Sequence, residues 1–150
     1  MKFALYSRQG GPIEQQFVQT IIDYLLAEQF EVLVHSNCAH PGTCYEPFSS
    51  HDDLKKSSNV DFVVSVGGDG SFIDAANLVG DLPIPIVGIN TGRIGFLSGI
   101  KKDNYRECFQ MLRENNYSLE KRFLLHVDTN APIGLDRTFA VNDVTIRTTD

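Results

Sequence analysis

The sequence of 150 residues lacks any apolar run long enough to cross a bilayer. A membrane-spanning helix needs about 20 predominantly apolar residues in succession, whereas the apolar runs here are of strand length and are interrupted by charge or proline. The first residues also lack the apolar core and small-residue cleavage site of a signal peptide. We therefore expect a cytoplasmic location.

Cysteine is scarce, and its positions fit no known ligand pattern. The chain has three cysteines, Cys38, Cys44 and Cys108, at spacings that match neither a zinc motif nor a redox motif. The histidines are scattered in the same way. We expect free thiols in a reducing compartment, and we assign no metal ligand.

An excess of positive charge is also absent. Lys and Arg together number 13 against 19 Asp and Glu, which gives a net charge of -6 at pH 7. Nucleic-acid binding needs a basic surface, so we do not expect a nucleic-acid partner. An acidic protein that binds nucleotides must rely on local backbone amides, a few cations and Mg²⁺.

What the sequence does contain is an apolar run at 62–66 that leads directly into Gly67, Gly68, Asp69 and Gly70. Glycine lets the backbone approach a ligand closely, and the first amides of a helix, expected at 71–79, favour an anion such as phosphate. That anion would repel Asp69, so we expect Asp69 to contact a hydroxyl or a metal. The alternative is an aspartate that bonds the backbone of its own turn.

Extended and helical patterns alternate over most of the chain. We expect strands at 2–6, 31–35, 62–66 and 84–89, helices at 12–29, 71–79 and 103–115, a helical turn at 51–56, and a loop at 36–50. In the helix at 12–29 the apolar positions are Ile13, Phe17, Ile21 and Leu25, and Asp103 is the expected N-cap of the last helix. This order predicts the α/β class, with a Rossmann-like parallel sheet layered by helices and ligands beyond the carboxyl ends of the strands.

From residue 119 the pattern changes. Two extended stretches at 121–129 and 139–148 have no helix between them, which predicts a β-hairpin. Because a lone hairpin is only marginally stable, we expect an α/β domain at 1–119 followed by the opening strands of a truncated, β-rich second domain at 120–150.

A second glycine-rich segment, at 88–99, follows one of the expected strands. It contains Asn90 and Arg93, and we expect it to form a wall of the ligand pocket; a simple tight loop is the alternative. Phe96 in this segment either packs in the core or contacts a base.

Three segments, at 66–72, 88–97 and 140–146, resemble in order and spacing the motifs of the NAD kinase family, and the resemblance spans about residues 2–146. That family phosphorylates the 2′-hydroxyl of the adenosine ribose of NAD, with ATP or polyphosphate as donor and a divalent cation such as Mg²⁺, and works as a homodimer or homotetramer. The resemblance implies that Asp69 is the catalytic carboxylate, that Gly70 lines the NAD site, and that Asn142 and Asp143 bind the dinucleotide.

The nucleotide-binding residues expected from motif and resemblance together are Gly67, Gly68, Asp69, Gly70, Asn90, Arg93, Phe96, Asn142 and Asp143. Adjacent strand residues face opposite ways, so we expect a backbone irregularity at 142–143. An aspartate is a weak base toward a ribose hydroxyl, and we therefore expect Asp69 to orient the nucleophile first and to accept its proton late.

The family's glycine-rich Ser-Thr-Ala-Tyr segment is not present in these residues, so we expect this chain alone to be inactive. Two other classes of function remain open. One is a different kinase with the same glycine turn that acts on a lipid or a sugar, and the other is a non-catalytic nucleotide-binding module.

Overall fold

The computed structural model describes residues 1–8, 10–39, 45–57, 59–93, 95–128, 139–141 and 143–144. Six strands form one parallel sheet, in the order β3-β2-β1-β4-β5-β6. These strands are β1 (Lys2–Ser7), β2 (Glu31–His35), β3 (Glu46–Phe48), β4 (Phe62–Val66), β5 (Ile86–Asn90) and β6 (Ile100–Lys101). The predicted α/β class with a parallel sheet is confirmed.

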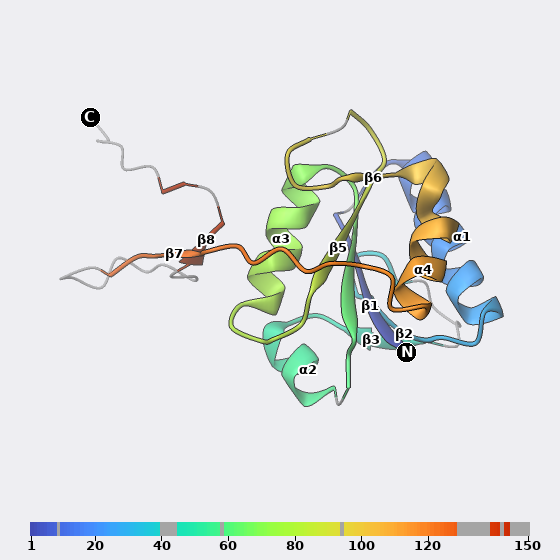
Figure 1. Ribbon diagram of the computed structural model, residues 1–150, viewed down its shortest axis with the longest axis horizontal. Helices are drawn as coiled ribbons and strands as arrows, with labels where there is room; N and C mark the ends of the chain where they lie inside the picture. The colour runs from blue at the N-terminus through green and yellow to red at the C-terminus, as the bar shows by residue number, and fades with distance from the viewer. Residues whose placement is uncertain are drawn as a thin grey trace.

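Helices cover both faces of this sheet (Figure 1). They are α1 (Pro12–Ala27), α2 (His51–Lys56), α3 (Asp69–Val79) and α4 (Tyr105–Arg113), the last preceded by a 3₁₀ turn, η1 (Lys102–Asn104). Because successive strand residues point to opposite faces, Phe3 and Leu5 of β1 pack under α1 and α4, whereas Ala4 and Tyr6 pack under α2 and α3. The sheet is therefore the middle of three layers.

The strand order places a topological switch point between β1 and β4. From β1 the chain builds outward through β2 and β3, and then returns to the other side of β1 as β4. Ligands of doubly wound sheets bind in the crevice beyond the carboxyl ends of the two strands at such a point. Here those carboxyl ends are Ser7 of β1 and Val66 of β4, which are in register, and the glycine turn follows Val66.

The expected loop at 36–50 is wrong in part, because it contains β3. This three-residue strand pairs with β2 at the edge of the sheet, and an edge position tolerates Pro47, which lacks an amide donor. Residues 40–44 of the expected loop lie outside the described residues. The two-residue strand β6 at the other edge was not expected at all.

Several helix and strand limits also differ from those expected. Helix α3 begins at Asp69 and not at residue 71, because Gly68 is its extended N-cap, and β5 begins at Ile86 and not at residue 84. Asp103 does not cap α4, since it lies within η1 and no side chain caps either helix.

The helical turn predicted at 51–56 is present as the six-residue helix α2, which Ser50 and Asp53 begin with a reciprocal capping box. Ile13, expected on the buried face of α1, is instead 82% exposed. The buried face of that helix consists of Val18, Ile21, Ile22 and Leu25. No helix in the described part of the chain is long and apolar enough to span a bilayer.

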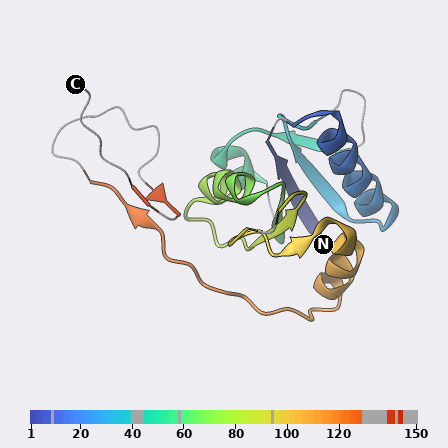
Figure 2. The same ribbon diagram turned by 90° about the horizontal axis from the view of Figure 1, so that it is seen from above.

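The expected hairpin is present as a short antiparallel pair, β7 (Leu125–His126) with β8 (Phe139–Ala140). Each strand has only two residues, so the expected strands at 121–129 and 139–148 are too long over the residues that the structure describes. The pair lies beside α3, away from α1 and α4 (Figure 2). The expected domain division after residue 119 stays a prediction.

Candidate active site

The glycine turn joins β4 directly to α3. Gly67 has a φ of +141°, which favours glycine, and a Cβ at this position would overlap with the Ser71 hydroxyl. The chain therefore turns at once from the buried strand into the helix. Asp69 and Gly70 consequently lie in the first turn of α3, at the carboxyl edge of the sheet.

The Asp69 carboxylate accepts three backbone N–H bonds from the loop after β5. The Phe96 amide donates to Oδ2 over 2.8 Å, and the amides of Leu97 and Ser98 donate to Oδ1 over 3.1 Å and 3.2 Å. The donors lie 27 to 29 residues further along the chain, so Asp69 organises a distant loop in addition to any role in its own turn.

These amide bonds also set the ionisation of Asp69. The bond from Phe96, and then those from Leu97 and Ser98, hold the pKa of the carboxyl below its ordinary value, so it is ionised at neutral pH. A carboxylate offers about four acceptor positions. Because Oδ1 takes two of the amide bonds and Oδ2 only one, Oδ2 can still accept a bond from a ligand hydroxyl.

The side chain of Asn90, the last residue of β5, also holds this loop. The side chain of Asn90 is buried, and its Nδ2 donates to the carbonyl oxygens of Arg93 over 2.9 Å and of Ser98 over 3.4 Å. Its Oδ1 accepts from the Gly92 amide over 2.8 Å. Asn90 was expected to bind the nucleotide. In the structure both the nitrogen and the oxygen of its side-chain amide are hydrogen-bonded to the backbone of this loop.

Two further glycines allow this close packing. A Cβ at Gly88 of β5 would lie 2.9 Å from both Ser98 Cα and the Phe72 ring, so the loop rests directly on the strand. A Cβ at Gly95 would overlap with the Asp69 carboxyl group. Sequence reasoning assigned no role to Gly95, although it lies within the second glycine-rich segment.

Phe96 lies next to the Asp69 contact and is 97% exposed. Of the two alternatives for Phe96, this exposure excludes packing in the core, and contact with a base stays a prediction. Arg93 is also exposed on this loop. An almost fully exposed aromatic ring beside an ionised carboxylate suits a base or another flat ligand.

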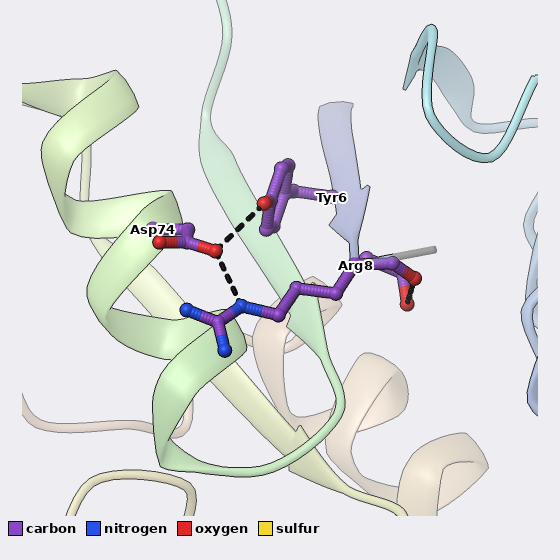
Figure 3. Close-up of polar contacts among 4 residues, drawn as sticks. Tyr6, Arg8 and Asp74 are labelled. Atoms are coloured by element: carbon purple, nitrogen blue, oxygen red, sulfur yellow. Dashed lines mark hydrogen bonds and ion pairs between the residues drawn. The ribbon is translucent and has the colours of Figure 1, made fainter. Parts of the chain in front are cut away.

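Arg8 is a residue of this edge that sequence reasoning missed. Its Nε donates to Asp74 Oδ2 over 2.6 Å, and the Tyr6 hydroxyl donates to the same oxygen over 3.0 Å (Figure 3). Burial, followed by the bond to Asp74, raises the pKa of Tyr6 to about 12, so this hydroxyl keeps its proton at neutral pH. The position of Arg8 directly after a strand was the available signal, but the sequence does not show that β1 is the neighbour of β4.

Of the last two predicted site residues, the structure describes only Asp143. Asn142 lies outside the described residues, so the predicted irregularity at 142–143 stays a prediction. Asp143 is exposed after β8. The second sheet meets α3 near its C-terminal end, where Leu124 and Phe139 share a hollow with Leu78. Asp69 is at the opposite end of this 11-residue helix, which is about 16 Å long.

A doubly wound parallel sheet with a glycine turn and an ionised carboxylate at its switch point defines the class of α/β proteins whose ligands bind at the carboxyl edge of the sheet. Comparison with known families narrows this class. Residues 13–117 match the family model described as the ATP-NAD kinase N-terminal domain, and the chain belongs to this family.

Curated relatives agree with this assignment. The chain is 38% identical over 134 residues to the NAD kinase of Flavobacterium psychrophilum, a match that covers 88% of this chain and 45% of the relative. It is 36% identical over 139 residues to the NAD kinase of Christiangramia forsetii, covering 91% and 46%. The chain thus spans about half the length of the curated relatives it matches.

Two solved structures share the fold. Yeast NADH kinase complexed with NADH superposes with a TM-score of 0.67 at 18% identity, over 87% of this chain and 44% of that one. An NAD kinase from Archaeoglobus fulgidus in complex with ATP superposes with a TM-score of 0.55 at 28% identity, over 83% and 41%.

Proposed function

We propose that the whole protein transfers the terminal phosphoryl group of ATP, or of inorganic polyphosphate, to the 2′-hydroxyl of the adenosine ribose of NAD. This chain would supply the catalytic carboxylate and the phosphate-binding turn, and the rest of the nucleotide pocket would come from a second, β-rich domain. The observation that carries the proposal is the ionised Asp69 carboxylate at the switch point, with acceptor capacity remaining on Oδ2.

The role of Asp69 follows from its surroundings. Three amide donors make it a weak base, so its first task is to orient the 2′-hydroxyl by accepting a bond from it. The 2′-oxygen then attacks the terminal phosphorus, and the bond from that phosphorus to the bridging oxygen breaks. The hydroxyl proton passes to the carboxylate as the new O–P bond forms.

We assign most of the other predicted residues to contacts with the nucleotide and one to holding the loop after β5. We propose that the backbone of Gly67, Gly68 and Gly70 lies along the phosphates and that Phe96 contacts a base. We also propose that Asn90 serves the site through the loop that it holds. In the whole protein, Arg93, Asn142 and Asp143 would contact the dinucleotide, as the resemblance implies.

In this scheme a divalent cation takes part as a complex with the phosphates of the donor. No group of three or more potential metal-ligating side chains exists among the described residues, so we propose that Mg²⁺ enters bound to the phosphates of the donor. The same proposal includes a homodimer or homotetramer, as the family resemblance implies, and the cytoplasmic location expected from the sequence.

The test is the Asp69→Asn variant of the whole protein. We expect the kcat for NADP formation to fall by about 10³-fold, because the positioning carboxylate is lost. The matched control is Asp52→Asn, which removes an acidic residue from the first turn of α2 instead, and it should retain activity. Normal NADP formation by Asp69→Asn would disprove the catalytic role. A wild-type protein that phosphorylates diacylglycerol or fructose phosphate, but not NAD, would disprove the substrate.

A further inference from the structure

A second charged side chain faces the glycine turn from the neighbouring strand. Ser7 is in register with Val66, so Arg8 follows β1 at the point where the glycine turn follows β4. The guanidinium lies against the first turn of α3, since a Cβ at Gly70 would come within 2.7 Å of Arg8 Nη1. Arg8 therefore lies at the switch point, beside Gly70, one of the residues assigned to the phosphates.

The orientation of this guanidinium is constrained by α3 and β1. Asp74, one helical turn after Gly70, accepts the bond from Arg8 Nε, and the Tyr6 hydroxyl donates to the same Asp74 oxygen (Figure 3). An arginine side chain is otherwise long and flexible, and a bond at Nε restricts the direction of the planar fork. The Nη side of the fork is the part that lies beside Gly70.

The Arg8 side chain is also accessible to a ligand. The Arg8 side chain is 58% exposed, whereas that of its partner Asp74 is only 28% exposed. The guanidinium is therefore held by Asp74 while more than half of the Arg8 side-chain surface stays exposed. A planar fork of N–H donors matches the oxygens of a phosphate group.

We propose that Arg8 binds the phosphate chain of the phosphoryl donor, and that Asp74 and Tyr6 are positioning residues that hold its guanidinium toward the glycine turn. This inference rests on the proposed function. The chemistry recognised is a chain of linked phosphates, which ATP and inorganic polyphosphate share. Arg8 would stabilise the negative charge on the donor while Asp69 orients the acceptor hydroxyl.

The test uses the whole protein with Arg8→Gln, Arg8→Lys and Tyr6→Phe. The matched control is Lys55→Gln, which removes one exposed positive charge from α2. KM is measured separately for ATP, for polyphosphate and for NAD. Calorimetric titration with magnesium tripolyphosphate adds a readout that needs no turnover, and thermal unfolding identifies variants that fail to fold.

We expect Arg8→Gln to raise KM for both donors by about tenfold or more, with KM for NAD changed by less than about twofold. Tripolyphosphate affinity should fall to a similar extent. Arg8→Lys should recover part of this loss, Tyr6→Phe should show a smaller defect of the same kind, and Lys55→Gln should show none. If Arg8→Gln does not fold, the lysine and Tyr6 variants carry the same test.

Unchanged donor KM and tripolyphosphate affinity would overturn the inference. An increase in KM for NAD alone would also overturn it, because it would place Arg8 on the pyrophosphate of the dinucleotide. A defect with ATP but not with polyphosphate would overturn it as well. If the wild-type protein forms no NADP but binds tripolyphosphate through Arg8, the proposed function fails and the phosphate assignment stands.

Discussion

The carboxylate of Asp69 lies directly against the α-carbon of Gly95, so closely that any side chain at position 95 would overlap with it. Asp69 begins α3 and Gly95 belongs to the loop after β5, and the amides that follow Gly95 donate to the same carboxylate. The residue proposed to orient the substrate therefore also holds the loop after β5 in place.

Gly95→Ala should separate this loop from Asp69. The added methyl group would displace the carboxylate or the amides of residues 96–98, and a displacement of about 1 Å at a reacting group can cost about 100-fold in rate. We expect a loss of that order in NADP formation by the whole protein. Gly92→Ala is the matched control, because a Cβ at Gly92 meets no atom within 4 Å. Equal activity of the two variants would contradict this contact.

Asn90→Ala should destabilise the loop without removing any group proposed to touch the ligand. The substitution leaves the backbone groups of Gly92, Arg93 and the buried Ser98 without their side-chain amide partner. We expect the free energy of unfolding to fall by about 1–3 kcal/mol, and the amides of residues 96–98 to exchange faster with deuterium. Unaltered exchange at these amides would show that Asn90 does not hold the loop.

Phe96→Ala should weaken ligand binding without destabilising the fold. The ring is almost fully exposed, so its removal should leave the melting temperature unchanged, whereas loss of a stacking contact should weaken NAD binding by about tenfold. Ile13→Ala, which removes another exposed apolar side chain, should affect neither property. Calorimetry and thermal unfolding measure both, and wild-type affinity in Phe96→Ala would exclude a ligand contact.

Cys38 should make the stability of the fold sensitive to alkali. Burial raises the pKa of this thiol from 9.0 to about 11, so the folded protein retains its proton at a pH where the unfolded chain has lost it. The resulting stability is fully present below pH 9 and is lost as the pH rises toward 11.

We therefore expect the wild-type protein to lose about 2 kcal/mol more than Cys38→Ala across that interval. The measurement is denaturant unfolding of both proteins at a series of pH values. Parallel pH profiles would show that the thiol ionises as easily in the folded protein as in the unfolded chain.

The sequence was sufficient for the strands and helices that bury the most surface. The strand at 62–66 is buried on both faces and leads into glycines, which predicted a parallel sheet with Asp69 at its carboxyl edge, and β4 and α3 confirm this. The strands β3 and β6 were missed because they have three and two residues and lie at the sheet edges. Segments that short carry almost no hydrophobic periodicity.

The arrangement of the site depended on contacts that a sequence does not display. The bonds from Asp69 to residues 96–98 join segments almost thirty residues apart, and Arg8 reaches the glycine turn only because β1 lies beside β4. From its residue type alone, Phe96 could pack in the core or contact a ligand. Its exposure depends on the hydrogen bonds of Asn90 and Asp69 that fix the conformation of the loop. These are tertiary contacts.

The most direct test of the central claim is a crystal structure of the whole protein with NAD and a non-hydrolysable donor bound. We expect the adenosine ribose 2′-oxygen to lie within about 2.5–3.0 Å of Asp69 Oδ2, with the terminal phosphate in line behind it. A ribose whose 2′-hydroxyl makes no contact with Asp69 would contradict the account.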